Sequence, residues 1–340
     1  MRIAIASGKG GTGKTTVAVN LALSLKDAQL VDCDVEEPNC NLFLDLELER
    51  LEEVTRYIPK IDPDKCTLCK SCSNFCRYNA LAALPSKVLF FPAICHGCGG
   101  CELICPEGAI TEITRSIGII EKAKADLSPE LPEFYHGVLN IGEAMATPLI
   151  KALLKHTNNK KSVILDSPPG AACPVLATVE DADYCLLVTE STPFGFHDFK
   201  LALKAVIALN VPFGVVLNRD GFGDSRVEDF CRVKNIPILL RIPNDKRIAQ
   251  LYSEGIPFVK EMPEWKEKFT DMFEAIRSFV ENPKKQMEDL KTKGEDPKKQ
   301  DEDLKKQRED LKTKGEDPKK QDEDLKKQGE EQKNLREKKV

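Results

Sequence analysis

The chain has 340 residues and a net charge of -5, with an isoelectric point near 5.7. Its length is enough for two domains, and its acidity argues against a protein that coats nucleic acid. No apolar stretch approaches the roughly 18 residues that span a bilayer, and no signal peptide is visible, so we expect a cytoplasmic protein without a membrane span. Thirteen cysteines in such a chain indicate metal ligands rather than disulfides.

The first segment, residues 1–57, predicts strand, glycine loop, helix and strand in the runs IAIA, SGKGGTGK, TTVAVNLALSL and AQLVDCD. The same alternation returns over 116–282, with the apolar runs SVILD, YCLLVTE, FGVVLN and IPILLRI. Short runs rich in β-branched residues are typical of strands buried on both faces. We therefore expect an α/β domain with a doubly wound, mostly parallel sheet. A cysteine-rich module at 58–115 interrupts it.

Residues 283–340 form a repetitive, charged tail. The segment EDLKTKGEDPKKQDEDLKKQ begins at Glu288 and begins again at Glu309. Leucine occurs at most once per heptad, and Pro297 and Pro318 occupy a leucine position, which excludes a coiled coil. The composition predicts a disordered tail. A docking tail for a partner is the alternative.

The glycine loop fits the pattern G-x-x-x-x-G-K-[ST] between a strand and a helix, which is the context of a phosphate-binding loop. Its glycines let backbone N–H groups point at phosphate, beside the positive end of a helix. We expect Lys14 to reach the β- and γ-phosphates of ATP and Thr15 to contact Mg²⁺. The residues expected to bind ATP and Mg²⁺ in this loop are Gly8, Lys9, Gly10, Gly11, Thr12, Gly13, Lys14, Thr15 and Thr16.

Two cysteine runs follow the bacterial ferredoxin spacing, in which the fourth cysteine of each run ligates the other cluster. This predicts an α+β ferredoxin-like module with two [4Fe–4S] clusters. The expected ligands are Cys66, Cys69, Cys72 and Cys105 for the first cluster, and Cys95, Cys98, Cys101 and Cys76 for the second. Zinc would use two C-x-x-C pairs and is not favoured. Arg77 stands where a proline usually follows the fourth cysteine, and His96 is read as a spacer. We expect electron transfer, with a purely structural role as the alternative.

The loop sequence KGGTGKT resembles the deviant phosphate loop of the MinD/ParA/nitrogenase iron-protein superfamily. In that family the first lysine reaches the nucleotide of a partner subunit. The resemblance therefore implies a sandwich homodimer that forms on ATP binding, with Lys9 acting in trans. The alternative is a surface lysine without a role.

Further motifs resemble the same family, over residues 1–282. The resemblance implies that Asp34 positions or deprotonates the attacking water and that Asp32 lies near Mg²⁺. It also implies that Asp166 holds Mg²⁺ through water and that the Gly170 N–H senses the γ-phosphate. Two further segments are expected at the adenine base, and their residues are Asn218, Arg219, Pro243 and Asp245.

Two features outside these motifs carry weaker expectations. Cys173 lies seven residues after Asp166, where the nitrogenase iron protein has a cysteine that ligates a bridging cluster; a small buried thiol is the alternative. An apolar stripe from Trp265 to Val280 predicts a last helix that packs on the sheet, rather than a membrane helix like that of MinD. His136, His156 and His197 receive no role.

Three functions follow from these patterns. The first is ATP-gated electron transfer through two [4Fe–4S] clusters to a redox partner. The second is an iron–sulfur or metal-cofactor carrier ATPase that serves a cofactor-assembly partner. It resembles Mrp-type proteins, although lone Cys231 stands where those carry a C-x-x-C. The third is a MinD/ParA-like regulatory switch with redox-sensing clusters.

Overall fold

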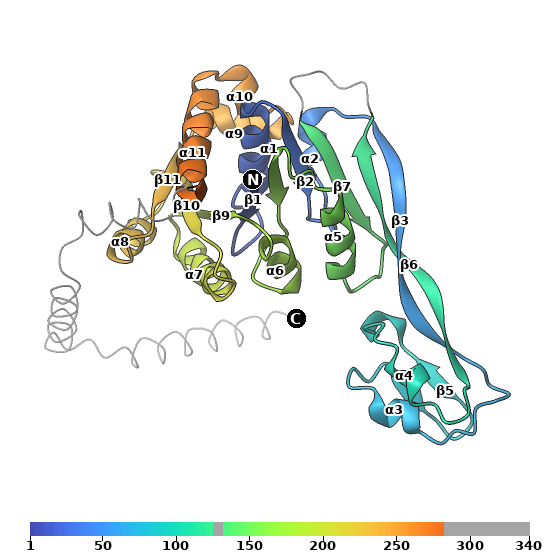
Figure 1. The fold of residues 1–340 in the computed structure, drawn as a ribbon. Helices are drawn as coiled ribbons and strands as arrows, with labels where there is room; N and C mark the ends of the chain where they lie inside the picture. The colour runs from blue at the N-terminus through green and yellow to red at the C-terminus, as the bar shows by residue number, and fades with distance from the viewer. Residues whose placement is uncertain (125–131, 282–340) are drawn as a thin grey trace, which may run out of the picture. The chain divides into compact units, whose positions relative to one another are not determined.

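A nine-stranded, mostly parallel sheet forms the centre of the fold, which is known from a computed structural model that describes residues 1–124 and 132–281 (Figure 1). The strand order is β11-β10-β9-β1-β8-β2-β7-β6-β3, and only the pairings of β6 with β7 and with β3 are antiparallel. The strands of this sheet are β1 (Arg2–Ala6), β2 (Ala28–Asp32), β3 (Leu48–Ile61), β6 (Ile110–Ala123), β7 (Glu133–Leu139), β8 (Ser162–Asp166), β9 (Tyr184–Glu190), β10 (Phe213–Asp220) and β11 (Ile238–Pro243).

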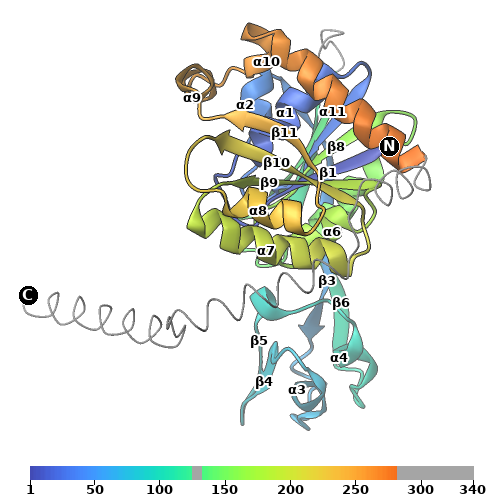
Figure 2. The same cartoon turned by 90° about the vertical axis from the view of Figure 1, so that its left-hand side faces the viewer.

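Helices cover both faces of the sheet, and alternate residues of each strand face opposite layers (Figures 1 and 2). Ile3 and Ile5 pack in one hydrophobic core, whereas Ala4 and Ala6 pack in the other, as the two-residue period of a strand requires. The helices of the first layer are α1 (Lys14–Ser24), α2 (Cys40–Leu44), α9 (Lys246–Ser253), α10 (Phe258–Glu261) and α11 (Glu264–Glu281). The helices of the second are α5 (Thr147–Leu153), α6 (Cys173–Val179), α7 (Pro193–Ala208) and α8 (Arg226–Val233).

The cysteine-rich module lies between the two longest strands, β3 and β6, which pair from Leu48↔Ala123 to Ile61↔Ile110. The predicted boundaries at 57/58 and 115/116 thus fall inside these two strands. The module has a small core of its own around Cys72, Leu81 and Ile110. Its elements are α3 (Ser71–Phe75), β4 (Leu81–Ala83), β5 (Val88–Phe90), a 3₁₀ helix (Pro92–Ile94) and α4 (Gly100–Leu103).

The fold class predicted from the sequence, an α/β domain with a mostly parallel sheet, is confirmed. The six apolar runs expected as strands form β1, β2, β8, β9, β10 and β11. The stripe of α11 packs in the first core, with Trp265, Phe269 and Ile276 buried. Over 1–124 and 132–281, no helix has the length and apolarity needed to cross a membrane. The tail predicted to be disordered, 283–340, lies outside the described residues.

Candidate functional site

The phosphate-binding loop joins β1 to α1 at the carboxyl edge of the sheet. Gly13 has φ 94°, a left-handed conformation that favours glycine. A Cβ at Gly13 would lie 2.3 Å from Nδ2 of Asn218, and this amide donates to the Thr12 carbonyl oxygen at 2.8 Å. Because helix α1 begins at Lys14, its free N–H groups and the positive end of its dipole face the loop. The loop is therefore shaped to hold an anion.

A cavity of about 340 Å³ opens beside the loop. It brings the loop together with several predicted residues, namely Asp34, Asn218, Arg219, Pro243 and Asp245. Pro169 and Asn244, which also line it, belong to segments that the family resemblance places at the nucleotide. Sequence reasoning missed the remaining lining residues, which are Glu37, Asn39, Ile248, Ala249 and Tyr252. Three of the missed residues, Ile248, Ala249 and Tyr252, lie on α9, and the sequence held a signal for the start of this helix. Aspartate is a common N-cap residue, and Asp245 caps α9 by accepting a hydrogen bond from the Arg247 N–H at 2.6 Å. Ile248 and Tyr252 give the cavity an apolar side, which suits a base.

The Asp32 and Asp166 carboxylates converge at the ends of β2 and β8, where their oxygens and the Cys40 sulfur lie within 4.8 Å of one another, and Asp34 follows two residues after Asp32. Asp166 accepts a hydrogen bond from the Thr15 hydroxyl at 2.6 Å, and its Oδ1 is buried without a partner. Burial, with the nearby Asp32 charge, raises the pKa of Asp166 to about 7, and the same two causes raise the pKa of Asp34 to about 6. Crowded carboxylates with an unsatisfied buried oxygen fit a bound divalent cation such as Mg²⁺.

Asp32 anchors the segment that follows β2. Its carboxylate accepts backbone N–H bonds from Asp34, Asn39 and Cys40 at 2.9–3.0 Å. Burial raises the pKa of Asp32, although these bonds oppose the shift. The Cys40 thiol, which sequence reasoning missed, donates to Asp166 at 3.4 Å. Asp32 therefore fixes the shape of the loop that carries Asp34.

Lys9 forms an ion pair within its own subunit. Its Nζ lies 2.6 Å from Oε1 of Glu190, at the end of β9, and Arg219 binds the other oxygen of Glu190 at 3.1 Å. Burial opposes the ionisation of Glu190, but the Lys9 hydrogen bond and charge hold the pKa of Glu190 below its usual value. Sequence reasoning missed Glu190. Its place at the carboxyl end of a parallel strand was the available signal.

Gly170, in the loop between β8 and α6, has φ 100°. Its N–H donates to the Ser7 carbonyl oxygen at 2.9 Å. A contact between this N–H and a γ-phosphate therefore requires the bond to Ser7 to be exchanged. Gly8 sits against α7, since a Cβ there would lie 2.0 Å from the Asp198 carbonyl oxygen. Six further residues expected at the nucleotide do not line the cavity, and they are Gly8, Lys9, Thr12, Asp32, Asp166 and Gly170.

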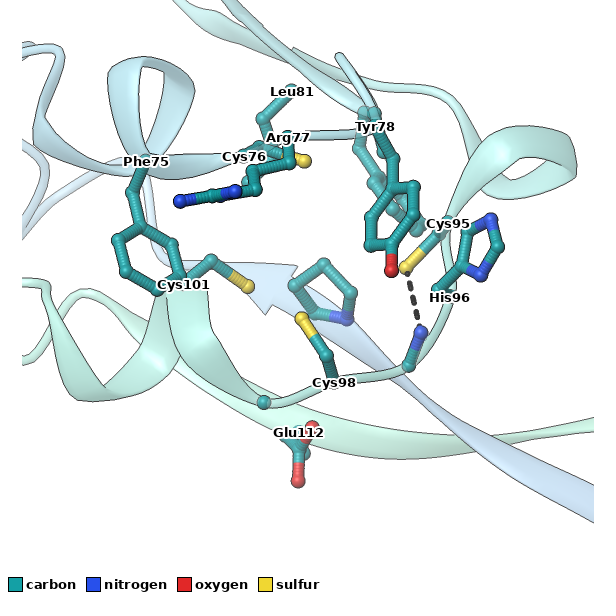
Figure 3. Close-up of a pocket in the computed structure, with 15 residues that line it drawn as sticks. Phe75, Cys76, Arg77, Tyr78, Leu81, Cys95, His96, Cys98, Cys101 and Glu112 are labelled. Carbon is teal, nitrogen blue, oxygen red and sulfur yellow. Dashed lines mark hydrogen bonds between the residues drawn. The ribbon is translucent and has the colours of Figure 1, made fainter.

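Two cavities in the module divide the eight cysteines into two sets of four. The larger, about 220 Å³, is lined by Cys76, Cys95, Cys98 and Cys101, whose side chains surround one space (Figure 3). The smaller is lined by Cys66, Cys69, Cys72 and Cys105. Each set takes its fourth cysteine from the other run, which is the exchange that the spacing predicts. Four thiols around one cavity fit an iron–sulfur cluster.

The larger cavity has an aromatic wall. The rings of Tyr78 and His96 stack with centroids 3.6 Å apart, and both line the cavity with Phe75 and Arg77 (Figure 3). His96 therefore takes part in packing beside the cysteines. The Cys95 sulfur accepts a hydrogen bond from the Gly97 N–H at 3.4 Å, a contact that favours a thiolate.

The remaining cysteines and histidines lie apart from these sets. Cys33, Cys185 and Cys231 are buried, whereas Cys173 is exposed at the start of α6. The three histidines given no role each pair with a carboxylate, and the pairs are His136–Glu121, His156–Glu52 and His197–Asp198. The contact of Cys173 with a bridging cluster stays a prediction.

A family model described as the CobQ/CobB/MinD/ParA nucleotide-binding domain matches residues 3–258. The chain belongs to this family. A Methanocaldococcus jannaschii protein described as uncharacterized is 34% identical over 266 residues, covering 76% of this chain and 92% of its own length. Membership of the CobQ/CobB/MinD/ParA family supports nucleotide binding by this chain.

Two more distant similarities complete the comparison. An iron–sulfur cluster carrier protein of Pyrococcus abyssi is 24% identical over 320 residues, with coverage of 88% of this chain and 90% of its own length. The solved structure of the cell division ATPase MinD from Pyrococcus furiosus aligns with a TM-score of 0.49 and 22% identity, over 82% of this chain and 98% of MinD.

Proposed function

We propose that this chain is an ATP-hydrolysing iron–sulfur protein that assembles or carries iron–sulfur or metal cofactors for a partner protein. The observation that carries the proposal is that one compact unit, Met1–Val280, holds both the nucleotide cavity and the two four-cysteine cavities. Relatives named iron–sulfur cluster carrier proteins, similar along 88% and 76% of this chain in two Pyrococcus species, favour this role.

The nucleotide site supplies the elements of phosphoryl transfer. Lys14 and the loop N–H groups bind the phosphates. The Thr15 hydroxyl, with Asp166 acting through water, would hold a Mg²⁺ ion, which would supply charge stabilisation for the transferred phosphoryl group. Asp34 orients the attacking water, and its raised pKa of about 6 suits a group that accepts a proton near neutral pH. Lys9 acts across a sandwich homodimer after leaving Glu190.

The eight module cysteines would hold two [4Fe–4S] clusters, which take up and release single electrons. Three cysteines of the second set are close together in the sequence, since Cys95, Cys98 and Cys101 lie on one loop and the start of α4. Cys76, which follows α3, completes it. The Gly97 N–H bond to the Cys95 sulfur stabilises the thiolate form.

Electron transfer gated by ATP is the second candidate function, and one observation favours it. The residue that stands in place of the Mrp-type C-x-x-C, Cys231, is 1% exposed. A transferable cluster needs accessible thiols, which Cys231 does not offer. The module cysteines, in two sets of four, would instead retain their clusters. The clusters would then stay in place and pass electrons to a redox partner.

One experiment separates the two candidates. The anaerobic protein is loaded with ⁵⁵Fe, reduced and mixed with an apo-ferredoxin acceptor or with an oxidised one, each with and without Mg-ATP. Carriage predicts ATP-dependent movement of ⁵⁵Fe to the apo-acceptor, and gated electron transfer predicts ATP-dependent reoxidation with iron retained. The control is Lys14→Ala, which removes the phosphate contact and leaves the module intact. Purified protein without iron would contradict both candidates.

A further inference from the structure

A buried ion pair joins the cysteine module to the nucleotide-binding domain. Arg56 on β3 and Glu143, in the loop between β7 and α5, lie 3.0 Å apart, with side chains 7% and 1% exposed. Arg115 stands opposite Arg56 on β6 and reaches the other Glu143 oxygen at 3.9 Å. Two like charges on paired strands repel, so Glu143 holds this part of the β3–β6 ladder together.

The same guanidinium reaches the second cysteine set. Arg56 donates from Nη1 to the Cys95 carbonyl oxygen and from Nη2 to the Pro92 carbonyl oxygen at 2.8 Å. Pro92–Ile94 is the 3₁₀ helix that leads into Cys95. A planar guanidinium holds several acceptors in fixed directions. The position of Arg56 is therefore tied to the backbone of a predicted cluster ligand.

The other end of the pair is tied to the segment that carries Asp34. The Leu139 N–H donates to the Val35 carbonyl oxygen at 2.8 Å, next to Asp34. The following residue, Asn140, donates its N–H to Ile117 at 2.9 Å and accepts from the Glu143 N–H at 3.0 Å. Because Gly118 pairs with Leu139 on the antiparallel β6–β7 ladder, the bond between Asn140 and Ile117 continues that ladder and ties the loop that carries Glu143 to β6.

We propose that Arg56 and Glu143 form a relay that couples the nucleotide state sensed by the Asp34 segment to the cluster held by Cys76, Cys95, Cys98 and Cys101. The inference rests on the proposed function, because it requires both a nucleotide and a cluster. Movement of the Asp34 segment pulls Leu139, shifts the loop that carries Glu143, and changes the fork of contacts that Arg56 makes. The positions of the Arg56 charge and of the Cys95 backbone next to the second cluster then change. The surroundings of the first cluster do not change.

Arg56 and Glu143 are positioning residues, and the decisive readout is the response of each cluster to nucleotide. In the anaerobic wild type, a non-hydrolysable ATP analogue is expected to shift the midpoint potential of one of the two clusters. Glu143→Gln keeps an oxygen acceptor but removes the charge, and Arg56→Lys keeps the charge but removes the fork. Both variants are expected to retain iron and nucleotide binding and to lose the shift.

The matched control is Glu53→Gln, which removes an exposed ion pair with Arg50 on the same strand and should keep the wild-type shift. A shift that persists in both relay variants, a shift that Glu53→Gln also loses, or a wild type without any shift overturns the relay. The iron content is measured first, and a protein without iron contradicts the proposed function instead. The mechanical part of the relay, from the Asp34 segment to the Cys95 backbone, needs no cluster. It is then decided by hydrogen exchange over residues 92–98, which nucleotide should change in the wild type and not in Glu143→Gln.

Discussion

The carboxyl groups of Asp34 and Asp166 remain protonated in the folded protein at pH values where the same groups of an unfolded chain are ionised. Their pKa values of about 6 and about 7 compare with an ordinary 3.8, and burial is the first cause in both. At pH values between the ordinary pKa of 3.8 and these raised pKa values, the folded state binds more protons than the unfolded state. The free energy of unfolding therefore falls as pH rises from about 4 to about 7 on account of these groups. Each pKa unit corresponds to about 1.4 kcal/mol at most.

We expect Asp166→Asn to remove much of this dependence. Without Mg²⁺ and nucleotide, the stability of the wild type relative to the variant should fall as pH rises through this window. Mg-ATP should flatten the difference, because a cation takes the place of the proton. The measurement is the denaturant midpoint at several pH values, with Asp271→Asn on the exposed face of α11 as the control. A pH-independent difference between wild type and Asp166→Asn would contradict the prediction.

The pairing of Lys9 with Glu190 places the lysine in a contact that it must leave to act in trans. A partly exposed ion pair contributes up to about 1 kcal/mol, which corresponds to about a fivefold change in an equilibrium. We therefore expect Glu190→Gln to favour the ATP-dependent dimer by up to about fivefold, and Lys9→Ala to abolish it. The measurement is sedimentation velocity with an ATP analogue.

The control for this test is Glu49→Gln, which breaks an exposed pair with Lys122 at 3.1 Å. It should dimerise as the wild type does. A Glu190→Gln protein that dimerises less readily than the wild type would mean that Glu190 orients Lys9 for the partner instead of restraining it.

Among the elements, helix α11 packs its apolar side in the first core. Phe269 is 0% exposed and packs against the rings of Phe258 and Trp265, with centroids 5.9 and 6.5 Å away. Truncation of such a ring removes its burial and leaves a cavity, at a cost of about 3–5 kcal/mol. We expect Phe269→Ala to lower the free energy of unfolding by this amount in denaturant titrations. Glu267→Ala, on the exposed side of α11, should stay near the wild type, and equal losses in both variants would refute the packing argument.

The elements also differ in how far the sequence predicts them. The six strands expected from the sequence are short apolar runs, and such runs are typical of strands buried on both faces of a sheet. Strand β3 escapes prediction because its first half, from Glu49 to Glu53, is exposed and charged at the sheet edge. In the candidate site, the phosphate loop follows from local spacing, whereas the contacts of Glu190 and Cys40 depend on segments far apart in the chain. Arg56 and Glu143 are likewise 87 residues apart.

At the scale of the whole molecule, the module is inserted at one point of the sheet. The β3–β6 ladder is continuous from the pair Thr55↔Ser116 to the pair Ile61↔Ile110, and the Asp62 N–H still donates to the Ala109 carbonyl oxygen at 2.7 Å. Strands paired in this way can be closed by a two-residue turn. The nucleotide-binding domain is therefore expected to tolerate removal of all residues between Ile61 and Ile110.

We expect a chain in which Asn-Gly replaces residues 62–109 to fold, to bind Mg-ATP as the full chain does and to hold no iron. The reason is that the turn satisfies the ladder, while both cores and all residues that line the nucleotide cavity lie outside the deleted segment. Calorimetric titration with nucleotide and iron analysis check this, with the full chain as the reference. Arg56 loses its contacts with Pro92 and Cys95 in this chain, so Glu143→Gln should change its nucleotide affinity no more than Glu53→Gln does. A deleted chain that fails to bind nucleotide would show that the module is part of the folding unit of the nucleotide-binding domain.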